Sequence, residues 1–384
     1  MRNEKIKRVI HVVSDMHRGG AETMIMNLYR NIDRSKLQFD FICHYRKGDL
    51  NGSNKRSDYE EEIVKLGGRI FKIPSLGTSN PIEYVNNIKK VLIENGPFEA
   101  IHVHTNKQAG FSLLAAKLAR IDKRIVHSHT ANWNTLNSIY MKVLKLLIKF
   151  NANMYCACGQ ESAISAFGKK FCYKKQIKIL TNSIDVEKYI DVDEEEVKTI
   201  RKKLNIGNTT KIIGHVGRID REKNHKFIIK IAQKLIENNE DFLIVLVGAG
   251  PMLDEIRLEV KKLNLSNNVK FLGVRKDINL LMNLFDVFIL PSIYEGLPLV
   301  TVEAQAAGKR CIVSEAVSNE IDMGLNLVKQ LPINEESLEL WKKEVMMIKE
   351  SNLDKKEVLS KLTLRGYNVK TNINKLYKLY GLNI

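Results

Sequence analysis

The sequence predicts an α/β protein built from two doubly wound, Rossmann-like domains, and three observations support this prediction. Short apolar runs that suit buried strands alternate with amphipathic segments that suit helices along most of the chain. The alternation stops near residue 185 and begins again after residue 190. The length of 384 residues is also more than one hydrophobic core usually serves. Repeated βα units of this kind form parallel sheets with helices on both faces.

The first half of the chain predicts a domain at residues 1–185. Its strand-like runs are 8–13, 39–43, 69–73, 100–104, 124–127, 154–157 and 177–180. Helical patterns lie between them at 21–31, 59–66, 82–94, 111–120 and 133–150. We place the end of this domain in the polar stretch 181–185.

The second half predicts a further domain at residues 186–365. Its strand-like runs are 212–216, 242–247, 269–272, 287–290 and 310–313. Its helical patterns are 194–204, 225–238, 252–263 and 278–285. Ligands of open α/β sheets bind beyond the carboxyl ends of the strands, so we expect the two domains to face each other across a ligand-binding cleft.

The composition is that of a soluble globular protein, with 44% hydrophobic and 27% charged residues. No stretch approaches the ~18 consecutive apolar residues that a transmembrane helix needs. The apolar run near the N-terminus is too short for a signal peptide. The five cysteines form no C-x-x-C pair and suit reduced, buried thiols. We therefore expect a cytoplasmic protein.

The positive charge is concentrated in the first half of the chain. Residues 1–190 carry 31 basic and 17 acidic residues, a net of +14, whereas residues 191–384 carry 30 and 27, a net of +3. This asymmetry predicts that the first domain meets an anionic partner, either a phosphate-bearing acceptor or a membrane surface. No zinc-finger or RNA-recognition signature accompanies the charge, so nucleic acid is not an expected partner.

The stretch from Pro291 to Gly308 predicts an anion-binding turn and helix after a buried strand. Pro298 suits the first helical position and Gly308 suits a helix end. The backbone N–H groups that follow Gly296, those of Leu299, Val300 and Thr301, would then point at the sheet edge and suit a phosphate. Two carboxylates, Glu295 and Glu303, flank this position and suit the hydroxyls of a ribose or another sugar.

Other strand ends in the second half offer groups that suit a diphosphate or a base. Gly217, Arg218 and Lys223 lie on the loop after strand 212–216, although a solvated basic loop is an alternative interpretation. Gly250 follows the next strand. Because glycine has no side chain, it leaves the same edge of the sheet open to a ligand. The backbone at Val274 and Arg275 follows the strand after that and could face a base.

Two features of the first half also predict a ligand site. Gly19 and Gly20 lie between the first strand and its helix, where the backbone could approach a ligand, or simply make a tight turn. They form no G-x-G-x-x-G motif, so no dinucleotide cofactor is indicated. His127 and His129 share one side of their strand. No third ligand with diagnostic spacing accompanies them, so we expect His129 to hydrogen-bond in the cleft rather than bind a metal. For His127, a structural role and a functional role remain equally good interpretations.

Two further patterns have mainly structural interpretations. His102 and His104 show the same alternate spacing and are interpreted as structural histidines. The segment 133–150 has an apolar stripe that includes Val143 and Phe150, flanked by lysines. It predicts either a basic amphipathic helix on an anionic membrane or a helix that faces the core, and the pattern favours neither.

Taken together, these motifs resemble those of the family 4 retaining glycosyltransferases. The motifs are G-G-A-E-T at 19–23, H-S-H-T at 127–130, G-R-I-D-x-x-K at 217–223 and E-x7-E from Glu295 to Glu303. The run Y-x-E-E-I-x-x-L-G-G-R-I at 59–70 is similar to bacterial capsular or exopolysaccharide members. The family has the GT-B fold, in which two Rossmann-like domains border a cleft.

The resemblance implies a role for each matching residue. Glu303 would hold the ribose of a nucleotide-sugar, and Arg218 and Lys223 would neutralise its diphosphate. Glu295 would contact the transferred sugar, and His129 would line the donor-sugar side. Gly19 and Gly20 would approach the diphosphate or the acceptor. The linker N-S-I-D at 182–185 lacks the hinge glycine that is usual in the family, and Leu297-Pro298 replaces the common Phe-Gly.

The resemblance also implies the reaction and its partners. A sugar would pass with retention from a nucleotide-sugar, with a UDP-sugar as the first candidate, to a growing saccharide on a lipid diphosphate. No metal and no cofactor would be needed. The first domain would bind the acceptor, and the last helix, 366–380, would pack back on it. The positive charge of the first domain separately predicts possible contact with the inner face of the membrane. Two alternatives are a non-hydrolysing nucleotide-sugar epimerase and a non-catalytic nucleotide-sugar-binding protein.

Overall fold

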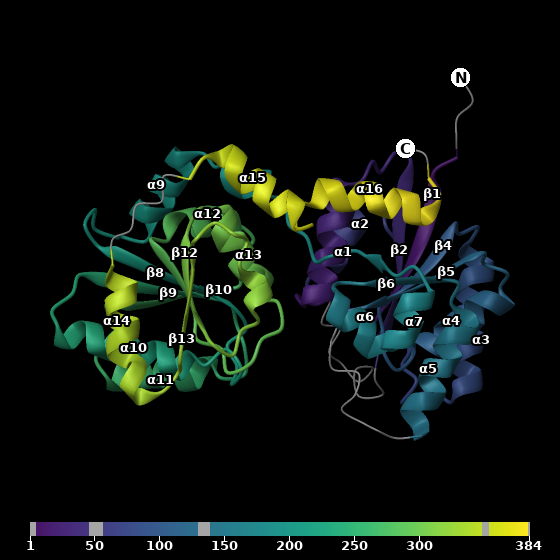
Figure 1. The fold of residues 1–384 in the computed structure, drawn as a ribbon, viewed down its shortest axis with the longest axis horizontal. Coiled ribbons are helices and arrows are strands. Elements are labelled where there is room, and N and C mark those ends of the chain that lie inside the picture. The colour runs from purple at the N-terminus through teal and green to yellow at the C-terminus, as the bar shows by residue number, and fades with distance from the viewer. Residues whose placement is uncertain (1–4, 46–56, 130–138, 348–352, 383–384) are drawn as a thin grey trace. The chain divides into compact units, whose positions relative to one another are not determined.

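The computed structural model describes residues 5–45, 57–129, 139–347 and 353–382. It divides into two compact units, shown in Figure 1. The first unit comprises Met1–Ser183 and Val369–Ile384, and the second comprises Ile184–Asn368. The sequence placed these boundaries after residues 185 and 365. Because the last segment returns to the first unit, the second unit is an insertion in chain order.

The first unit contains a seven-stranded parallel sheet in the order β3-β2-β1-β4-β5-β6-β7. Its strands are β1 (Lys7–Val13), β2 (Leu37–Tyr45), β3 (Ile70–Pro74), β4 (Ala100–Val103), β5 (Lys123–Ser128), β6 (Met154–Ala157) and β7 (Lys178–Ile179). Its helices are α1 (Gly20–Asn31), α2 (Glu60–Lys65), α3 (Pro81–Asn95), α4 (Ala109–Leu118), α5 (Ile139–Asn151), α6 (Gln160–Phe167), α7 (Lys169–Lys174) and α16 (Val369–Tyr380).

The helices of the first unit cover both faces of its sheet (Figure 1). One core lies between the sheet and α3, α4, α5 and α6, and the other lies between the sheet and α1, α2 and α16. Helix α16 is tied to this second core by Val369, Leu376 and Tyr380, which are fully or almost fully buried. The hydroxyl of Tyr377 accepts a 2.9 Å hydrogen bond from the backbone N–H of Asp33. The returning helix is therefore an integral part of the first unit.

The second unit contains a six-stranded parallel sheet in the order β10-β9-β8-β11-β12-β13. Its strands are β8 (Lys211–Val216), β9 (Phe242–Val247), β10 (Val269–Gly273), β11 (Val287–Leu290), β12 (Arg310–Ser314) and β13 (Val328–Leu331). Its α-helices are α8 (Glu187–Ile190), α9 (Glu194–Lys203), α10 (His225–Glu237), α11 (Leu253–Lys262), α12 (Ile278–Leu284), α13 (Leu299–Ala306), α14 (Leu338–Met346) and α15 (Lys355–Leu364). Strand β9 is buried along its whole length, as expected for a parallel sheet covered on both faces.

Each sheet has one point where the strand order reverses. In the first unit this switch lies between β1 and β4, and in the second it lies between β8 and β11. From these pairs, successive strands are added outward in opposite directions, so the loops that leave them diverge and open a crevice. The loops after β1 and β8 hold the glycine and basic motifs singled out in the sequence. The switch points therefore mark where ligand-binding groups are expected in each unit.

Several elements differ from those predicted from the sequence. The helix predicted at 133–150 begins at Ile139, and residues 130–138 lie outside the described residues. Pro298 precedes α13 as its N-cap, so the prediction that it occupies the first helical position is wrong. The last helix begins at Val369 rather than at residue 366. Helices α6, α7, α8, α14 and α15 and strand β13 were not predicted, because their short or polar segments lack a clear apolar period.

Gly214 on β8 offers a test of core packing in the second unit. A Cβ atom added at Gly214 would lie 2.0 Å from the Cδ2 atom of Phe285, a fully buried side chain. We expect Gly214→Ala to lower the free energy of unfolding by about 1–3 kcal/mol, because the ring must leave its rotamer. Urea unfolding would measure this cost. Gly77→Ala is the control, since nothing lies within 4 Å of its added Cβ, and an equal cost for both would contradict the packing argument.

Candidate active site

The switch point of the second unit brings Lys223 and Glu295 into contact. Lys223 follows β8 and Glu295 follows β11, and the Nζ of Lys223 forms an ion pair with Oε1 of Glu295. Each side chain is only 17% exposed. The two loops are also joined by a 2.8 Å hydrogen bond from the backbone N–H of Ile293 to the carbonyl of Glu222. Two residues predicted separately from the sequence thus form one partly buried, charged pair.

Arg218 lies on the same loop as Lys223 but projects into solvent. Its side chain is 72% exposed, and its Nε lies 4.0 Å from Oδ2 of Asp220, at the outer limit of an ion pair. A planar guanidinium so weakly held can turn and bind two oxygens of a diphosphate at once. The switch point therefore offers one mobile cation beside one that is already paired.

The start of α13 lies directly beyond this pair. Leu299 and Val300 are partly exposed at the first turn, and Gly296 in the preceding loop is exposed. Thr301 is fully buried, and both its N–H and its hydroxyl bond to the carbonyl of Pro298. The expected use of the Thr301 N–H for a ligand is therefore wrong, because the first turn of the helix already uses it. The N–H groups of Leu299 and Val300 remain the candidates.

Glu303 lies on the same helix and has two neighbours that sequence reasoning missed. Burial raises the pKa of its carboxyl to about 7, although a hydrogen bond from Tyr189 and the charge of Lys188 lower it. Both residues come from the short helix α8, directly after the crossing into the second unit. No motif marks them, since only the fold brings α8 against α13. A carboxyl poised near neutrality suits hydroxyls that stabilise its charged form.

Glu303→Gln should therefore make the second unit more stable at pH 8 and leave its stability at pH 4 unchanged. The folded pKa of about 7 exceeds the ordinary 4.5, so ionisation opposes folding as the pH rises from 4.5 to 7. We expect a gain of at least about 1 kcal/mol at pH 8, which is roughly 2–4 °C in Tm. Thermal unfolding at both pH values checks this. An equal shift at pH 4 would contradict the titration argument.

Three of the four remaining predicted residues of the second unit, Gly217, Gly250 and Arg275, have structural contacts in the described chain. A Cβ at Gly250 would lie 2.2 Å from the carbonyl oxygen of Ile219, so this glycine permits two loops to touch. At Gly217, a Cβ would lie 3.2 Å from the ring of His215, and the stem of Lys223 packs over the same position. Arg275 forms an ion pair with Asp277, whereas Val274 is 54% exposed. The two glycines are therefore explained by packing, without a ligand.

The glycine pair of the first unit begins α1, next to the β1–β4 switch point. Gly19 is the N-cap residue in an extended conformation, and Gly20 is the first helical residue. The carboxylate of Glu22 folds over Gly19, where a Cβ would lie 2.2 Å from Oε2. The nearest atom to a Cβ at Gly20 is Nδ2 of Asn182, at 3.8 Å. The start of α1 thus faces the stretch in which the chain leaves the first unit.

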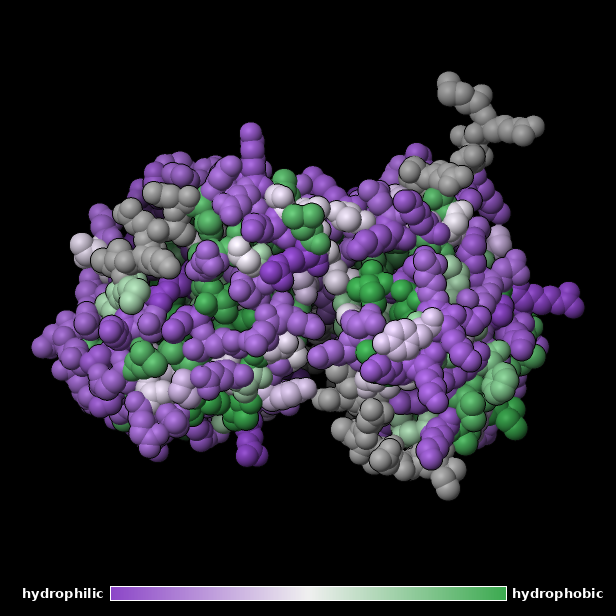
Figure 2. Space-filling model, in the orientation of Figure 1, coloured by the Kyte–Doolittle hydropathy of each residue, from purple (hydrophilic) through white to green (hydrophobic). Residues whose placement is uncertain are grey.

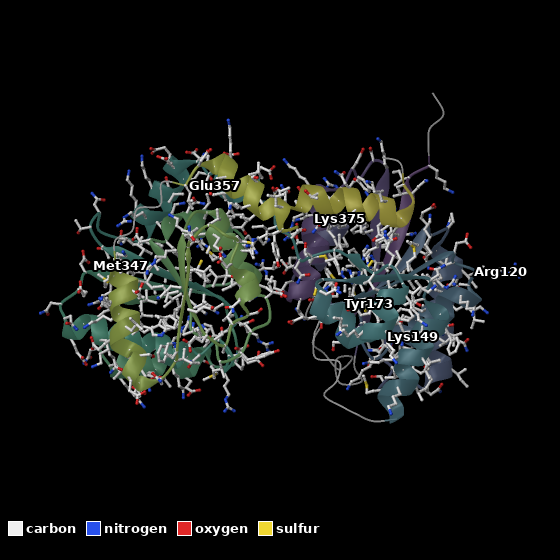
Figure 3. All side chains as sticks on the ribbon, in the orientation of Figure 1. Arg120, Lys149, Tyr173, Met347, Glu357 and Lys375 are labelled. Atoms are coloured by element: carbon white, nitrogen blue, oxygen red, sulfur yellow. The ribbon has the colours of Figure 1, made fainter. Side chains whose placement is uncertain are left out.

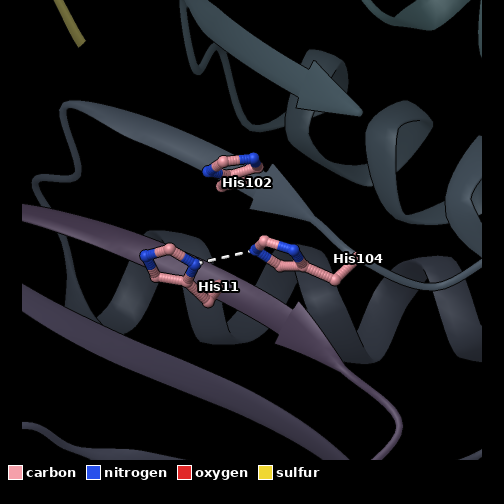
Figure 4. A group of neighbouring side chains, drawn as sticks. All are labelled: His11, His102 and His104. Carbon is pink, nitrogen blue, oxygen red and sulfur yellow. Dashed lines mark hydrogen bonds between the residues drawn. The ribbon is translucent and has the colours of Figure 1, made fainter. Parts of the chain in front are cut away.

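Five of the nine histidines form one buried cluster in the first unit. His11 is on β1, His102 is on β4 beside it, and His104 follows β4 directly (Figure 4). His127 is on β5 and His129 follows it. The Nδ1 of His11 lies 2.9 Å from Nε2 of His104, and the Nδ1 of His104 lies 2.8 Å from Nε2 of His129.

The cluster supplies the third imidazole that the sequence did not show beside His127 and His129. One ring nitrogen from each of His104, His127 and His129 lies within 4.8 Å of the others, and the same holds for His11, His102 and His104. The nitrogens of His104 are engaged with neighbouring rings, however, and the Nδ1 of His102 bonds to the hydroxyl of Tyr380 at 2.8 Å. The observed arrangement is thus a hydrogen-bonded network on three adjacent strands.

Helix α5 has one apolar face in the core and a second one at the surface. Met141, Leu144 and Ile148 are buried, whereas Val143, Leu146 and Phe150 are 48%, 50% and 73% exposed. Of the two alternatives left open for this segment, the core-facing one therefore does not hold for Val143 and Phe150. Lys149 lies beside this exposed face, and the nearby Tyr173 on α7 is 80% exposed (Figure 3). Apolar patches of this kind interrupt the mostly hydrophilic surface in Figure 2.

Comparisons with known proteins identify the chain. Residues 18–188 match the family described as Glycosyltransferase Family 4, and residues 196–361 match that described as Glycosyl transferases group 1. A putative glycosyltransferase of Bacillus subtilis, EpsF, is 41% identical and is matched over 99% of this chain and 98% of its own. The chain belongs to the family 4 glycosyltransferases. The resemblance inferred from the motifs is confirmed.

Further relatives of this glycosyltransferase agree with that assignment. The UDP-Gal:alpha-D-GlcNAc-diphosphoundecaprenol alpha-1,3-galactosyltransferase of Escherichia coli is 27% identical over 79% of this chain and 82% of its own. The crystal structure of Anabaena HepE in complex with UDP and glucose has a TM-score of 0.72 at 18% identity, covering 98% of this chain and 99% of that one. This likeness shows the fold alone. The predicted GT-B fold, with two Rossmann-like parallel-sheet domains, is confirmed.

Proposed function

We propose that this glycosyltransferase moves a sugar from a nucleotide-sugar to a saccharide on a lipid diphosphate, with retention of the anomeric configuration, during synthesis of a cell-surface polysaccharide. The observation that carries the proposal is the group at the β8–β11 switch point: Arg218, the Lys223–Glu295 pair and the exposed first turn of α13. A relative from Staphylococcus aureus is named as a capsular polysaccharide biosynthesis glycosyltransferase. Relatives from Escherichia coli and Campylobacter jejuni are named for diphosphoundecaprenol-linked acceptors.

The second unit is proposed to bind the donor through its diphosphate and its ribose. Arg218 and Lys223 place two positive charges where a leaving diphosphate gains negative charge, so they would stabilise the transition state more than the bound substrate. The N–H groups of Leu299 and Val300 would add hydrogen bonds to the phosphate oxygens. Glu303 would accept hydrogen bonds from the ribose hydroxyls. The proposal requires no metal ion and no cofactor at this site, and its first candidate donor is a UDP-sugar.

The first unit is proposed to bind the acceptor. Glu295 would accept a hydrogen bond from a hydroxyl of the transferred sugar in place of part of its ion pair with Lys223. In the first unit, His129, Gly19 and Gly20 would contact the sugar or the acceptor. The net charge of +14 over residues 1–190 suits the diphosphate of a lipid-linked saccharide. The exposed face of α5 and its lysines would hold the protein on the inner face of the membrane. No helix in the described ranges is long and apolar enough to cross a membrane.

A panel of nucleotide-sugars tests the proposed reaction. The purified protein would be mixed with UDP-galactose, UDP-glucose, UDP-N-acetylglucosamine or GDP-mannose, and with an undecaprenyl-diphosphate sugar. We expect one donor to release its nucleoside diphosphate and to yield a product with the anomeric configuration of the donor, read by NMR. Isomerised donor without transfer would instead indicate an epimerase. Nucleotide binding without turnover would indicate a binding protein, and an inverted product would contradict retention.

Replacement of Leu146 and Phe150 by serine should weaken binding to anionic vesicles. Each side chain would bury apolar surface in the membrane, so the double replacement should lower affinity for phosphatidylglycerol-containing vesicles by at least about tenfold. Vesicle co-sedimentation measures the affinity. Ile82→Ser is the control, because Ile82 is 75% exposed but lies at the start of α3. If Ile82→Ser lowers the affinity for vesicles equally, the exposed face of α5 is not a specific membrane-binding surface. Equal affinity for neutral and anionic vesicles would show that its lysines do not contribute.

A further inference from the structure

The five-histidine cluster contains a chain of three hydrogen-bonded imidazoles that ends at His129. The chain runs from His11 through His104 to His129, with nitrogen–nitrogen distances of 2.9 and 2.8 Å. Figure 4 shows its inner half, in which the rings of His11 and His104 meet nitrogen to nitrogen. His11 packs against Phe39 and Phe41 deep in the core. His129 is the member that is not fully enclosed, beyond the carboxyl end of β5.

All three rings are neutral near pH 7, and this restricts the directions of their bonds. Burial lowers the pKa of His11 to about 3 and that of His129 to about 4, and it lowers the pKa of His104 well below its ordinary value. A neutral imidazole has one N–H and one bare nitrogen. His104 uses both nitrogens, so it donates one bond and accepts the other. The protons of the chain therefore lie either all on Nδ1 or all on Nε2.

The groups at the two ends decide between these states. With the protons on Nε2, His11 would point an N–H into the core, where its Nε2 has no hydrogen-bond partner among the described groups. Orphaned buried N–H groups are rarer than unpaired acceptors. At the other end, Nδ1 of His129 and Oδ1 of Asn182 are both buried and unpaired, and Asn182 raises the pKa of His129. A proton on Nδ1 of His129 thus faces an amide acceptor.

We propose that His11 and His104 are positioning residues that hold His129 in a single tautomer, with its proton on Nδ1 and its Nε2 occupied by His104. This inference rests on the proposed function only in that His129 then meets bound substrate. With Nε2 already accepting a bond from His104, the Nδ1–H is the group left to contact a ligand. His129 would therefore donate a hydrogen bond to a substrate oxygen and would not act as a general base.

The contact between His129 and Asn182 places the three hydrogen-bonded histidines beside the stretch in which the polypeptide leaves the first unit. Asn182 lies in the stretch that ends the first unit, and Asn27 and Asn372 anchor the residues on either side of it. The Nδ2 of Asn27 donates to the carbonyl of Ser183 at 2.9 Å, and the Nδ2 of Asn372 donates to the carbonyl of Thr181 at 3.0 Å. A ligand oxygen that competes with Asn182 for the Nδ1–H would thus bind next to a fixed segment.

Nitrogen NMR of the full chain labelled with ¹⁵N-histidine tests the tautomer directly. Long-range correlations show which ring nitrogen carries the proton, and single-histidine variants assign the signals. At pH 7 we expect the proton of His129 on Nδ1. In His104→Phe, which removes the donor to Nε2 but leaves Asn182 in place, a second population with its proton on Nε2 should appear, whereas His104→Gln, whose amide can still donate to Nε2, should retain the single original tautomer. His11→Met, whose thioether can accept a bond from Nε2 of His104 but cannot donate one, should populate the same second tautomer and serves if His104→Phe does not fold.

His127→Phe is the matched control for activity and for tautomer. His127 is fully buried on the same strand, but its ring nitrogens form no hydrogen bond to His11, His104 or His129. We expect His104→Phe to lower kcat/KM by about tenfold, as for loss of one hydrogen bond, with recovery in His104→Gln and little change in His127→Phe. If no donor supports transfer, the proposed function is wrong. The NMR experiment would still determine which nitrogen of His129 carries the proton.

Three results would overturn the inference. One is a proton on Nε2 of His129 in the unaltered protein. Another is a single, unchanged tautomer of His129 in both His104→Phe and His11→Met. The third is one equivalent of zinc in the purified protein, found by elemental analysis, because an ion held by His11, His102 and His104 would replace the His11–His104 hydrogen bond.

Discussion

Arg218→Ala should lower kcat by about 10²–10³ and change donor affinity much less. The guanidinium is expected to bind the diphosphate most strongly as the glycosidic bond breaks, when negative charge accumulates on the leaving oxygens, and loss of one such group costs about this factor. Because the side chain is 72% exposed and only weakly paired with Asp220, its removal should leave the fold intact. Steady-state kinetics with the identified donor, together with nucleotide titration, would separate the two effects.

Arg221→Ala is the control for this prediction. Arg221 lies on the same loop, three residues from Arg218, and is exposed, but it is not part of the proposed diphosphate site. Its removal changes the net charge of the loop by the same amount. If both variants lose activity equally, general attraction of the anionic donor explains the effect. If Arg218→Ala keeps full kcat, the proposed role of Arg218 is wrong.

Lys223→Met should lower kcat/KM by at least about 10² and also destabilise the second unit. The first effect removes a fixed charge from the proposed diphosphate site. The second arises because Glu295, whose side chain is only 17% exposed, loses its cationic partner and retains only the 3.5 Å hydrogen bond from the hydroxyl of Ser292, at a cost of about 1–3 kcal/mol. Adding Glu295→Gln to this variant should restore most of the stability and none of the activity. Urea unfolding and kinetics on the single and double variants would check both expectations.

The exposed pair Lys226–Glu255 gives a matched cycle of variants in the same unit. Its side chains are 51% and 52% exposed, so the coupling free energy between them should be within about 0.2–1 kcal/mol. A coupling between Lys223 and Glu295 no larger than this would show that their contact contributes little to the fold. Unfolding of Lys223→Met at the same urea concentration as the unaltered protein would likewise show that this contact contributes little to the fold. Full activity of Lys223→Met would contradict its place in the donor site.

Local sequence patterns were sufficient to predict the two sheets and much of the second-unit site. Runs such as 242–247 are apolar throughout, and such a run fits a strand covered on both faces. Arg218, Lys223 and Glu295 each follow such a run, so the alternation of strands and helices places them at one sheet edge. Their identification required no contact between distant parts of the chain, because parallel strands end together.

The features that were missed depend on the order of the strands in the sheet. His104 was interpreted as structural and His129 as functional, because nothing in the sequence shows that β1, β4 and β5 are neighbours. Tyr189 reaches Glu303 only through packing of α8 on α13, and the polar segments of α14 and α15 carry little apolar period. Thr301 was expected to bind a ligand, but the capping pattern of its own helix uses its N–H.

The return of α16 to the first unit has a consequence for synthesis of the chain on the ribosome. Both ends of the second unit are bonded together, since Ile184 pairs with Asn368 and its N–H donates to the carbonyl of Tyr367 at 2.9 Å. The second unit can therefore close before the last helix exists. The first unit, although translated earlier, must wait for the buried side chains of α16 to complete its core. Nascent chains that stop before Val369 should thus hold a finished second unit and an unfinished first one.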